Sequence, residues 1–207
     1  NYVSMNSVKN IVFDFGGVLL DWNPRYLYRD YFNDDKEMEH FLADICNSDW
    51  NNLQDAGRPF AEAVKLLQDK HPEYSEAIRM YDEQWSKMLK CEFPESIDLL
   101  KKLKKAGYGI YGLTNWSAEK IGIAFARYDF FDLFDGIVVS GEEKVVKPDP
   151  KIFHILLERY GLKADECVFI DDNLSNINTA KLLSFNAIRF DNIKNVKKTL
   201  QEMGVKF

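Results

Sequence analysis

Cysteine and histidine are both scarce in this sequence. The three cysteines, Cys46, Cys91 and Cys167, are odd in number, lie far apart and form no C-x-x-C pair. This pattern argues against a disulfide framework or a cysteine-based zinc site, and it fits a reducing compartment such as the cytoplasm. The three histidines show no spacing typical of metal ligands, such as H-E-x-x-H. We expect them to be surface or partly packed residues.

Long apolar runs, a targeting segment and an excess of positive charge are missing as well. No apolar run approaches the ~18 residues that a membrane span needs. The N-terminal region lacks the basic segment and apolar stretch of a signal peptide, and Met5 is a candidate for the natural start. The 27 Lys and Arg residues against 33 Asp and Glu residues give a net charge of −6, so the basic footprint of a nucleic-acid-binding protein is absent. We therefore expect neither a membrane nor a nucleic acid as a partner; the sequence leaves monomer or dimer open.

What the sequence does have is an ordinary globular composition and a regular alternation of elements. The 207 residues, 46% of them hydrophobic, are enough for one large domain or a domain with an inserted lobe. Short apolar runs predict buried strands at residues 11–13, 108–113, 136–139, 168–170 and 187–190. Helices are predicted at residues 94–106, 117–127, 149–160, 174–184 and 193–203. Alternating strands and helices predict an α/β fold, a Rossmann-like, doubly wound parallel sheet.

Residues 21–90 interrupt this alternation. They are some 70 residues more than a strand–helix–strand unit needs, since such a unit takes about 30 in all. The segment contains no convincing strand, and helix-like stretches lie near residues 24–33, 36–46, 59–70 and 73–89. We predict a core domain of residues 1–20 and 91–207 and an inserted α-helical cap domain of residues 21–90 over the C-terminal edge of the sheet.

Charged and polar residues gather where the predicted strands end. They are Asp14, Thr114, Asn115, Lys147, Asp171 and Asp172. In open α/β sheets ligands bind at this edge, so the six side chains are expected to meet. Clustered carboxylates repel one another unless a cation lies among them, and Mg²⁺ takes carboxylates, water and substrate phosphate as ligands. An aspartate can also attack phosphorus and form an aspartyl-phosphate. The cluster therefore indicates phosphoryl chemistry.

Four ordered motifs carry a family resemblance. They are IVFDFGGVL at residues 11–19, IYGLTN at 110–115, KPDPKIF at 147–153 and VFIDDN at 168–173. With these motifs the chain resembles the haloacid dehalogenase superfamily of hydrolases, in the form that carries a helical cap between the first two motifs. The resemblance covers residues from about 10 to about 191. It implies an enzyme, a phosphatase that acts on a small phosphorylated metabolite with Mg²⁺.

The resemblance also implies roles for individual residues. Asp14 would be the nucleophile and a magnesium ligand, and the main-chain carbonyl of Gly16 a second ligand. Asp172 would be the main ligand of the fourth motif, with Asp171 a ligand or its supporting partner. Thr114 and the amide of Asn115 would hold the phosphoryl oxygens, and Lys147 would neutralise Asp14 and the phosphoryl group. Gly17 lies in the same turn and is a candidate substrate-binding residue.

Gly16 departs from the family pattern. Most phosphatases of the family carry an Asp two residues after the nucleophile, which protonates the leaving oxygen, and a glycine cannot do this. The first and fourth motifs resemble the α-glucose-1-phosphate phosphatase branch, whose leaving oxygen is comparatively acidic. A sugar phosphate, sugar 1-phosphates included, is therefore the expected substrate. The alternatives are a 2-haloacid dehalogenase-like hydrolase, since halide leaves without a proton, and a catalytically weak binding protein.

Two further residues, Arg58 and Asp21, are candidates for the site. Arg58, in the sequence Asp55-Ala56-Gly57-Arg58 of the predicted cap, could clamp a second anionic or hydroxyl group of the substrate. A surface arginine with its stem packed down is an equally good interpretation. Asp21 could approach the site as a replacement acid, although a solvated loop carboxylate or helix cap is the favoured interpretation.

Overall fold

A five-stranded sheet forms the centre of the computed structural model, which describes residues 7–207; the candidate start at Met5 lies outside the described residues. The strand order is β5-β4-β1-β6-β7, and every neighbouring pair is parallel. The strands are β1 (Asn10–Phe13), β4 (Gly109–Thr114), β5 (Gly136–Val139), β6 (Cys167–Asp171) and β7 (Asn186–Arg189). Because β1 lies centrally and the chain winds outward from it in both directions, the predicted doubly wound α/β fold is confirmed.

The predicted flanking helices are present, and local chemistry sets several of their ends. They are α6 (Pro94–Lys105), α7 (Ile121–Arg127), α9 (Pro150–Tyr160), α10 (Leu174–Leu182) and α11 (Ile193–Glu202). Pro94 occupies the first turn of α6, where a missing N–H breaks no hydrogen bond. The Asp149 carboxylate accepts a hydrogen bond from Lys151 N and caps α9, and Gly161 ends that helix with a left-handed φ of 63°. The loops also hold α8 (Ser140–Glu143), η3 (Asp129–Leu133) and η4 (Ala164–Glu166).

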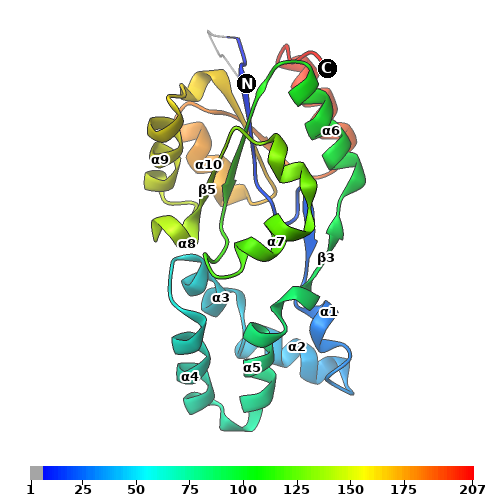
Figure 1. The fold of residues 1–207 in the computed structure, drawn as a ribbon, viewed down its shortest axis with the longest axis vertical. Coiled ribbons are helices and arrows are strands. Elements are labelled where there is room, and N and C mark those ends of the chain that lie inside the picture. The colour runs from blue at the N-terminus through cyan, green and yellow to red at the C-terminus, as the bar shows by residue number, and fades with distance from the viewer. Residues whose placement is uncertain (1–6) are drawn as a thin grey trace.

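Each face of the sheet is covered by its own pair of helices (Figure 1). Alternate residues of β1 point to opposite faces: Ile11 and Phe13 pack in the cluster that includes leucines of α6 and Val196 of α11, whereas Val12 packs with residues of α9 and α10. Both faces are buried, which explains why β1 and β6 read as continuous apolar runs. The sheet is therefore a rigid platform whose carboxyl edge is left for a site.

A second, two-stranded sheet corrects the prediction that residues 21–90 hold no strand. β2 (Leu20–Trp22) pairs antiparallel with β3 (Leu89–Glu92). The two strands contain both predicted domain boundaries, at 20/21 and 90/91. Three- and four-residue strands carry too little periodicity to be recognised, and their pairing joins segments far apart in the chain. Asp21 lies in β2 and accepts a hydrogen bond from the Tyr26 hydroxyl at 2.7 Å.

Residues 23–88, which we name the helical lobe, are helical between these two strands. The helices are α1 (Arg25–Tyr28), α2 (Asp35–Asp44), α3 (Ser48–Asp55), α4 (Phe60–Lys70), η1 (Pro72–Tyr74), α5 (Ser75–Glu83) and η2 (Trp85–Met88). α3 was not among the helices predicted from the sequence; the Asn47 side chain caps its first turn. The lobe has its own aromatic core, in which Tyr28 packs edge to face against Phe41 and also lies beside Tyr81. The lobe forms the lower end of the molecule in Figure 1, where α3 contacts α8 of the sheet domain. We keep the two-domain division as a proposal.

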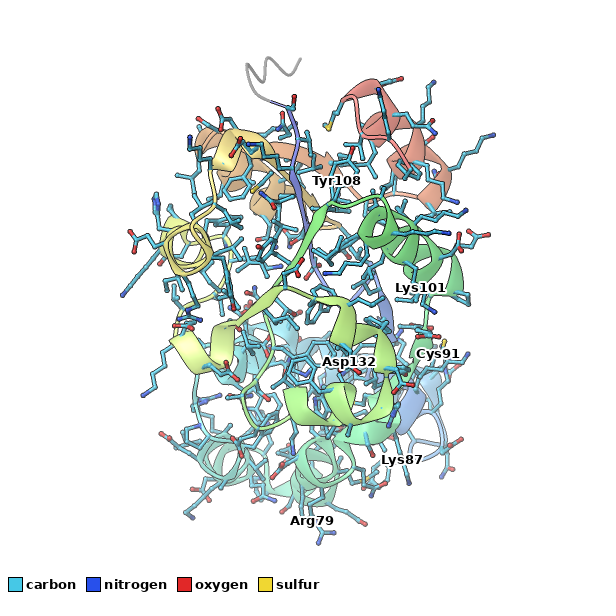
Figure 2. The ribbon with its side chains drawn as sticks, turned by 45° about the horizontal axis from the view of Figure 1, so that its top comes forward. Arg79, Lys87, Cys91, Lys101, Tyr108 and Asp132 are labelled. Carbon is cyan, nitrogen blue, oxygen red and sulfur yellow. The ribbon has the colours of Figure 1, made fainter. Side chains whose placement is uncertain are left out.

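Charged residues of several helices lie at the surface of the molecule. Lys101 on α6 and Arg79 on α5 both lie at the outside (Figure 2) and are exposed. Lys104, also on α6, pairs with Asp135 at 2.8 Å. Among the described residues, no helix has the length and apolar character needed to cross a membrane.

Candidate active site

Lys147 is the centre of a buried charge cluster at the carboxyl edge of the sheet. It lies in the loop before α9, and only 3% of its surface is exposed. Its ammonium donates hydrogen bonds to Asp14 Oδ1 at 2.9 Å, to Asp171 Oδ2 at 2.8 Å and to the Leu113 carbonyl at 2.7 Å. These partners come from the ends of β1, β6 and β4, which are neighbours in the sheet. One ammonium therefore ties three strands together at the site.

Asp171 is fully buried, and both of its carboxylate oxygens are occupied. Oδ1 accepts from the main-chain N–H of Asn173 at 2.9 Å, and Oδ2 accepts from Asn176 Nδ2 at 3.0 Å as well as from Lys147. Asp172, the next residue, is exposed and lines the cleft. The sequence Asp-Asp-Asn thus places one carboxylate in a fixed, hydrogen-bonded position and the other in contact with the cleft.

The pKa values of the cluster reflect burial and mutual repulsion. Burial raises the pKa of Asp14 well above its usual range, and Asp171 raises it further, so that the ion pair with Lys147 offsets only part of the shift. Burial, then the charge of Asp171, raises the pKa of Asp172. Burial also acts to raise the pKa of Asp171, but Lys147 and the hydrogen bonds listed above outweigh it and leave that pKa below its usual value. The cluster has an excess of negative charge that one lysine does not balance.

The donor set of this cluster fits a hard divalent cation. One oxygen from each of Asp14, Asp171 and Asp172 lies within 4.8 Å of the others. Three carboxylates against one ammonium leave a negative excess that a cation would neutralise, and oxygen ligands suit Mg²⁺. Gly17 makes the arrangement possible: its φ is +83°, and a Cβ built on it would lie 2.4 Å from Asp172 Oδ2. The turn after β1 therefore has to carry a glycine next to the Asp172 carboxylate.

Thr114 and Asn115 end β4 beside Lys147, but their side chains are placed differently. Both side-chain groups of Asn115 bind the main chain of Lys147: Nδ2 donates to its carbonyl at 3.0 Å, and Oδ1 accepts from its N–H at 2.8 Å. The side chain of Asn115 therefore positions Lys147. Thr114 Oγ1 is buried and has no hydrogen-bond partner among the described residues. Thr114 itself is not among the residues that line the cleft described below.

A cleft of about 490 Å³ lies between the sheet edge and the helical lobe. The sheet side contributes the carboxylates, Lys147 and Gly16, and the lobe side contributes Ser48, Asn51, Asp55 and Phe60. Indole rings also line it: Trp85 lies 5.5 Å from Trp116 and 6.4 Å from Trp22 between ring centroids. The indole N–H groups of Trp22 and Trp116 are buried without a partner among the described residues. The cleft thus offers aromatic surface next to the charge cluster.

The lobe is held against the sheet domain by polar contacts around this cleft. The Ser140 hydroxyl donates to the Asp55 carbonyl at 2.6 Å, and Glu119 Oε2 accepts from the main-chain N–H of Phe60 at 2.8 Å. Lys120 Nζ binds Asp82 of α5 and lies 4.8 Å from the centroid of the Phe60 ring. These contacts describe a closed arrangement in which lobe residues face the sheet edge.

Of the two candidate residues Gly16 and Arg58, only Gly16 lines the cleft. Gly16 lines it, and a Cβ built on Gly16 meets no atom within 4 Å, so the position has room for a side chain. Arg58 is absent from the residues that line the cleft, and its Nε donates to Gln54 Oε1 at 2.8 Å. Arg58 Nη2 is buried and has no hydrogen-bond partner among the described residues. The expected contact of Arg58 with a substrate therefore stays a prediction, as does the alternative of a packed arginine stem.

Several cleft residues were not predicted from the sequence, among them Asp55, Trp22 and Trp116. Asp55 begins the short Asp-Ala-Gly-Arg sequence that also contains Arg58. Trp22 ends β2, and Trp116 follows Asn115 directly. A tryptophan close behind a polar strand end is the signal that could have pointed to an aromatic wall.

Comparisons with known proteins give the family and the fold. The family model of haloacid dehalogenase-like hydrolases matches residues 8–183. The chain is 24% identical to (S)-2-haloacid dehalogenase 4A of Burkholderia cepacia over 209 residues, 90% of this chain and 84% of that protein. It is 28% identical to the sesquiterpene phosphatase astK of Aspergillus oryzae over 174 residues, 84% of this chain and 85% of that protein. A HAD family enzyme of Bacteroides thetaiotaomicron, solved with magnesium and inorganic phosphate, matches with a TM-score of 0.67 and 24% identity over 88% of this chain and 94% of that chain.

Proposed function

We propose that this chain, which belongs to the haloacid dehalogenase-like hydrolases, is a magnesium-dependent phosphatase that acts on a small phosphomonoester. The observation that carries the proposal is the carboxylate cluster of Asp14, Asp171 and Asp172, whose oxygens lie within 4.8 Å of one another. A reaction that expels halide needs no such cluster, because no phosphoryl charge has to be neutralised. The phosphatase relative and the magnesium–phosphate complex of a structural neighbour support the same choice.

In this mechanism the residues of the chain position the phosphoryl group and neutralise its negative charge. Asp14 attacks phosphorus with a carboxylate oxygen, and the ester oxygen leaves from the opposite side, which yields an aspartyl-phosphate that water then hydrolyses. Lys147 holds Asp14 at 2.9 Å and supplies positive charge to the phosphoryl group. We keep for Thr114, whose hydroxyl has no hydrogen-bond partner among the described residues, the role that the resemblance implies, which is to bind a phosphoryl oxygen. Mg²⁺, held by Asp14, Asp172, the Gly16 carbonyl and, directly or through its neighbour, Asp171, would neutralise the remaining charge.

A polyhydroxylated leaving group, such as a sugar, suits the cleft best. The rings of Trp22, Trp85 and Trp116 line the cleft and offer surface on which the apolar face of a sugar ring can stack. The polar side chains of Ser48 and Asn51 in the same lining offer groups that can hydrogen-bond sugar hydroxyls. We therefore propose a sugar phosphate as the substrate, and the resemblance to the α-glucose-1-phosphate phosphatase branch makes sugar 1-phosphates the first to test.

Two other functions remain as alternatives. A 2-haloacid dehalogenase-like activity is favoured by Gly16, because halide needs no proton, and by the relative from Burkholderia cepacia. A binding protein with little catalysis would also tolerate Gly16. Retention of Asp14, Lys147 and Asp172 in one cluster counts against the second alternative.

The decisive experiment measures phosphate release from a panel of small phosphomonoesters with Mg²⁺ and with EDTA. Turnover that requires Mg²⁺ is expected, and it should be faster for sugar 1-phosphates than for the matching 6-phosphates, whose leaving oxygen is less acidic. Chloride release from 2-chloropropionate, measured in parallel, tests the dehalogenase alternative. Halide release without phosphate release would replace the phosphatase with a dehalogenase, and binding of a phosphate mimic without turnover would favour the binding protein.

Replacement of Gly17 by alanine is expected to weaken the metal site. The added Cβ would lie 2.4 Å from Asp172 Oδ2 and would sit on a backbone with φ +83°, so the Asp172 carboxylate has to move. We expect Mg²⁺ to bind about 10–100-fold more weakly, as when groups supporting metal ligands are lost. Titration of phosphate release with Mg²⁺ measures the change.

Gly122→Ala is the matched control for this variant. A Cβ at Gly122 meets no atom within 4 Å, and the residue is an exposed position of α7. Its Mg²⁺ dependence should equal that of the unaltered protein. Equal Mg²⁺ dependence in Gly17→Ala would mean that Asp172 is not a ligand.

A further inference from the structure

The cleft contains one ionisable side chain that the proposed reaction does not yet use. Five residues that line it can ionise, namely Asp14, Asp55, Lys147, Asp171 and Asp172. Four of them form the charge cluster on the sheet side. Asp55, the last residue of α3, lies on the lobe side. The proposed reaction in turn lacks one group, a proton donor for the leaving oxygen, because Gly16 has no side chain.

We propose that Asp55 is the general acid–base residue of this enzyme. The helical lobe thus supplies, from across the cleft, the proton donor that Gly16 cannot provide. This inference rests on the proposed phosphatase function. In an in-line displacement the leaving oxygen departs on the side opposite the attacking carboxylate. Asp14 attacks from the sheet edge, so the leaving oxygen points toward the lobe wall, to which Asp55 belongs.

The main chain at Asp55 is fixed from the sheet side. Its carbonyl accepts a hydrogen bond at 2.6 Å from the hydroxyl of Ser140, which is fully buried and itself accepts from the main-chain N–H of Trp116 at 2.9 Å. Gly57, two residues further on, lies next to the side chain of Lys144, the residue that follows α8. The Asp55 carboxyl makes no hydrogen bond to any described residue. The backbone is therefore held in place while the carboxyl stays free for a ligand.

Burial allows Asp55 to carry a proton near neutral pH, against the charge of Lys147. Lys147 lies across the cleft with Asp14, Asp171 and Asp172. On the side of α8 lie Glu142, Glu143, which pairs with Arg159, and Lys144, the residue that follows the helix. Arg58 of the same turn is directed to Gln54. Burial raises the pKa of Asp55 to about 7, although the charge of Lys147 lowers it. A general acid works best with a pKa near the operating pH.

The proton balance of the two steps is complete with Asp55 alone. As the Asp14 oxygen bonds to phosphorus and the bond from phosphorus to the leaving oxygen breaks, the Asp55 carboxyl gives its proton to that oxygen and the alcohol departs. The Asp55 carboxylate then takes a proton from the water that attacks the aspartyl-phosphate. Inorganic phosphate leaves, and both aspartates return to their starting states. The sum is ester plus water giving alcohol plus phosphate.

The test compares leaving groups that need a proton with one that does not. Asp55→Asn keeps the size of the side chain and removes the proton. We expect it to lower kcat/KM for alkyl phosphates, such as sugar 6-phosphates, by about 10²–10³-fold. Hydrolysis of p-nitrophenyl phosphate, whose phenolate leaves unprotonated, should change less than about threefold by the same argument. The unaltered protein should lose alkyl-phosphate activity as the pH rises through about 7, and the variant should not show this limb.

Two further variants make the outcome unambiguous. Asp49→Asn, an exposed aspartate of the same helix, should behave like the unaltered protein. Gly16→Asp combined with Asp55→Asn puts an acid at the open position after β1 and should recover about tenfold or more of the lost alkyl-phosphate rate.

The failure of this inference differs from the failure of the proposed function. No phosphate release by the unaltered protein from any ester would overturn the phosphatase itself. Normal release combined with an Asp55→Asn variant that slows both classes of ester equally, or neither, would overturn the role of Asp55 and leave the phosphatase in place.

Discussion

Asp14→Asn is expected to reduce phosphate release on the order of 10⁵-fold, the loss typical when a covalent nucleophile is removed. Asparagine keeps the shape of the side chain and an oxygen that can accept the hydrogen bond from Lys147, now 2.9 Å from Asp14 Oδ1. It cannot form the aspartyl-phosphate. Single-turnover measurement of phosphate release, with Mg²⁺ in excess, checks the size of the effect. Residual activity above about 1% would mean that another group attacks phosphorus.

The same substitution is expected to leave the metal-free fold as stable as before or more stable. Burial and the neighbouring Asp171 raise the pKa of Asp14, which means that folding disfavours its charged form at neutral pH. Asparagine removes one negative charge from a cluster in which a single ammonium faces three carboxylates. Urea unfolding in EDTA at pH 7 measures this, and Asp98→Asn, an exposed residue of α6, is the control. A clear loss of stability would show that the Asp14–Lys147 pair outweighs the repulsion.

The parallel sheet was predictable from sequence because each strand is buried on both faces. Residues such as Val12 and Ile170 therefore lie in apolar runs that local pattern reveals. The position of the charge cluster followed from topology, since the carboxyl ends of neighbouring parallel strands must meet. The roles given to its members stay predictions until variants are measured.

The features of the fold and of the site that the sequence did not predict depend on contacts between segments far apart in the chain. The β2–β3 pair joins the two ends of the helical lobe, and neither strand has enough residues to show a period. The isolation of the Asp55 carboxyl depends on the docking of its main chain to Ser140. The hydrogen bond from Arg58 Nε to Gln54 Oε1 is a further contact that the sequence pattern did not indicate.

Lys147→Met is expected to cost about 3–5 kcal/mol of unfolding free energy at pH 8, because a buried ion pair loses one partner. The Lys147 ammonium binds Asp14, Asp171 and the Leu113 carbonyl and is the charge that balances Asp171, which is fully buried. Methionine fills the space of the stem and restores none of these hydrogen bonds. Denaturant unfolding measures the loss. Lys101→Met, at an exposed position of α6 (Figure 2), should change stability by less than about 0.5 kcal/mol.

The pH dependence of Lys147→Met distinguishes an electrostatic cause from a packing defect. In the unaltered protein the lowered pKa of Asp171 contributes stability that is present above its unfolded pKa, about 4, and is lost as the pH falls through the folded pKa. Without Lys147, burial dominates and raises the folded pKa of Asp171, so the variant loses stability as the pH rises above about 4. The difference between the two proteins should therefore shrink by more than half between pH 8 and pH 4.5. A difference that stays constant over this range would assign the loss to packing and would remove Lys147 as the residue that neutralises the site.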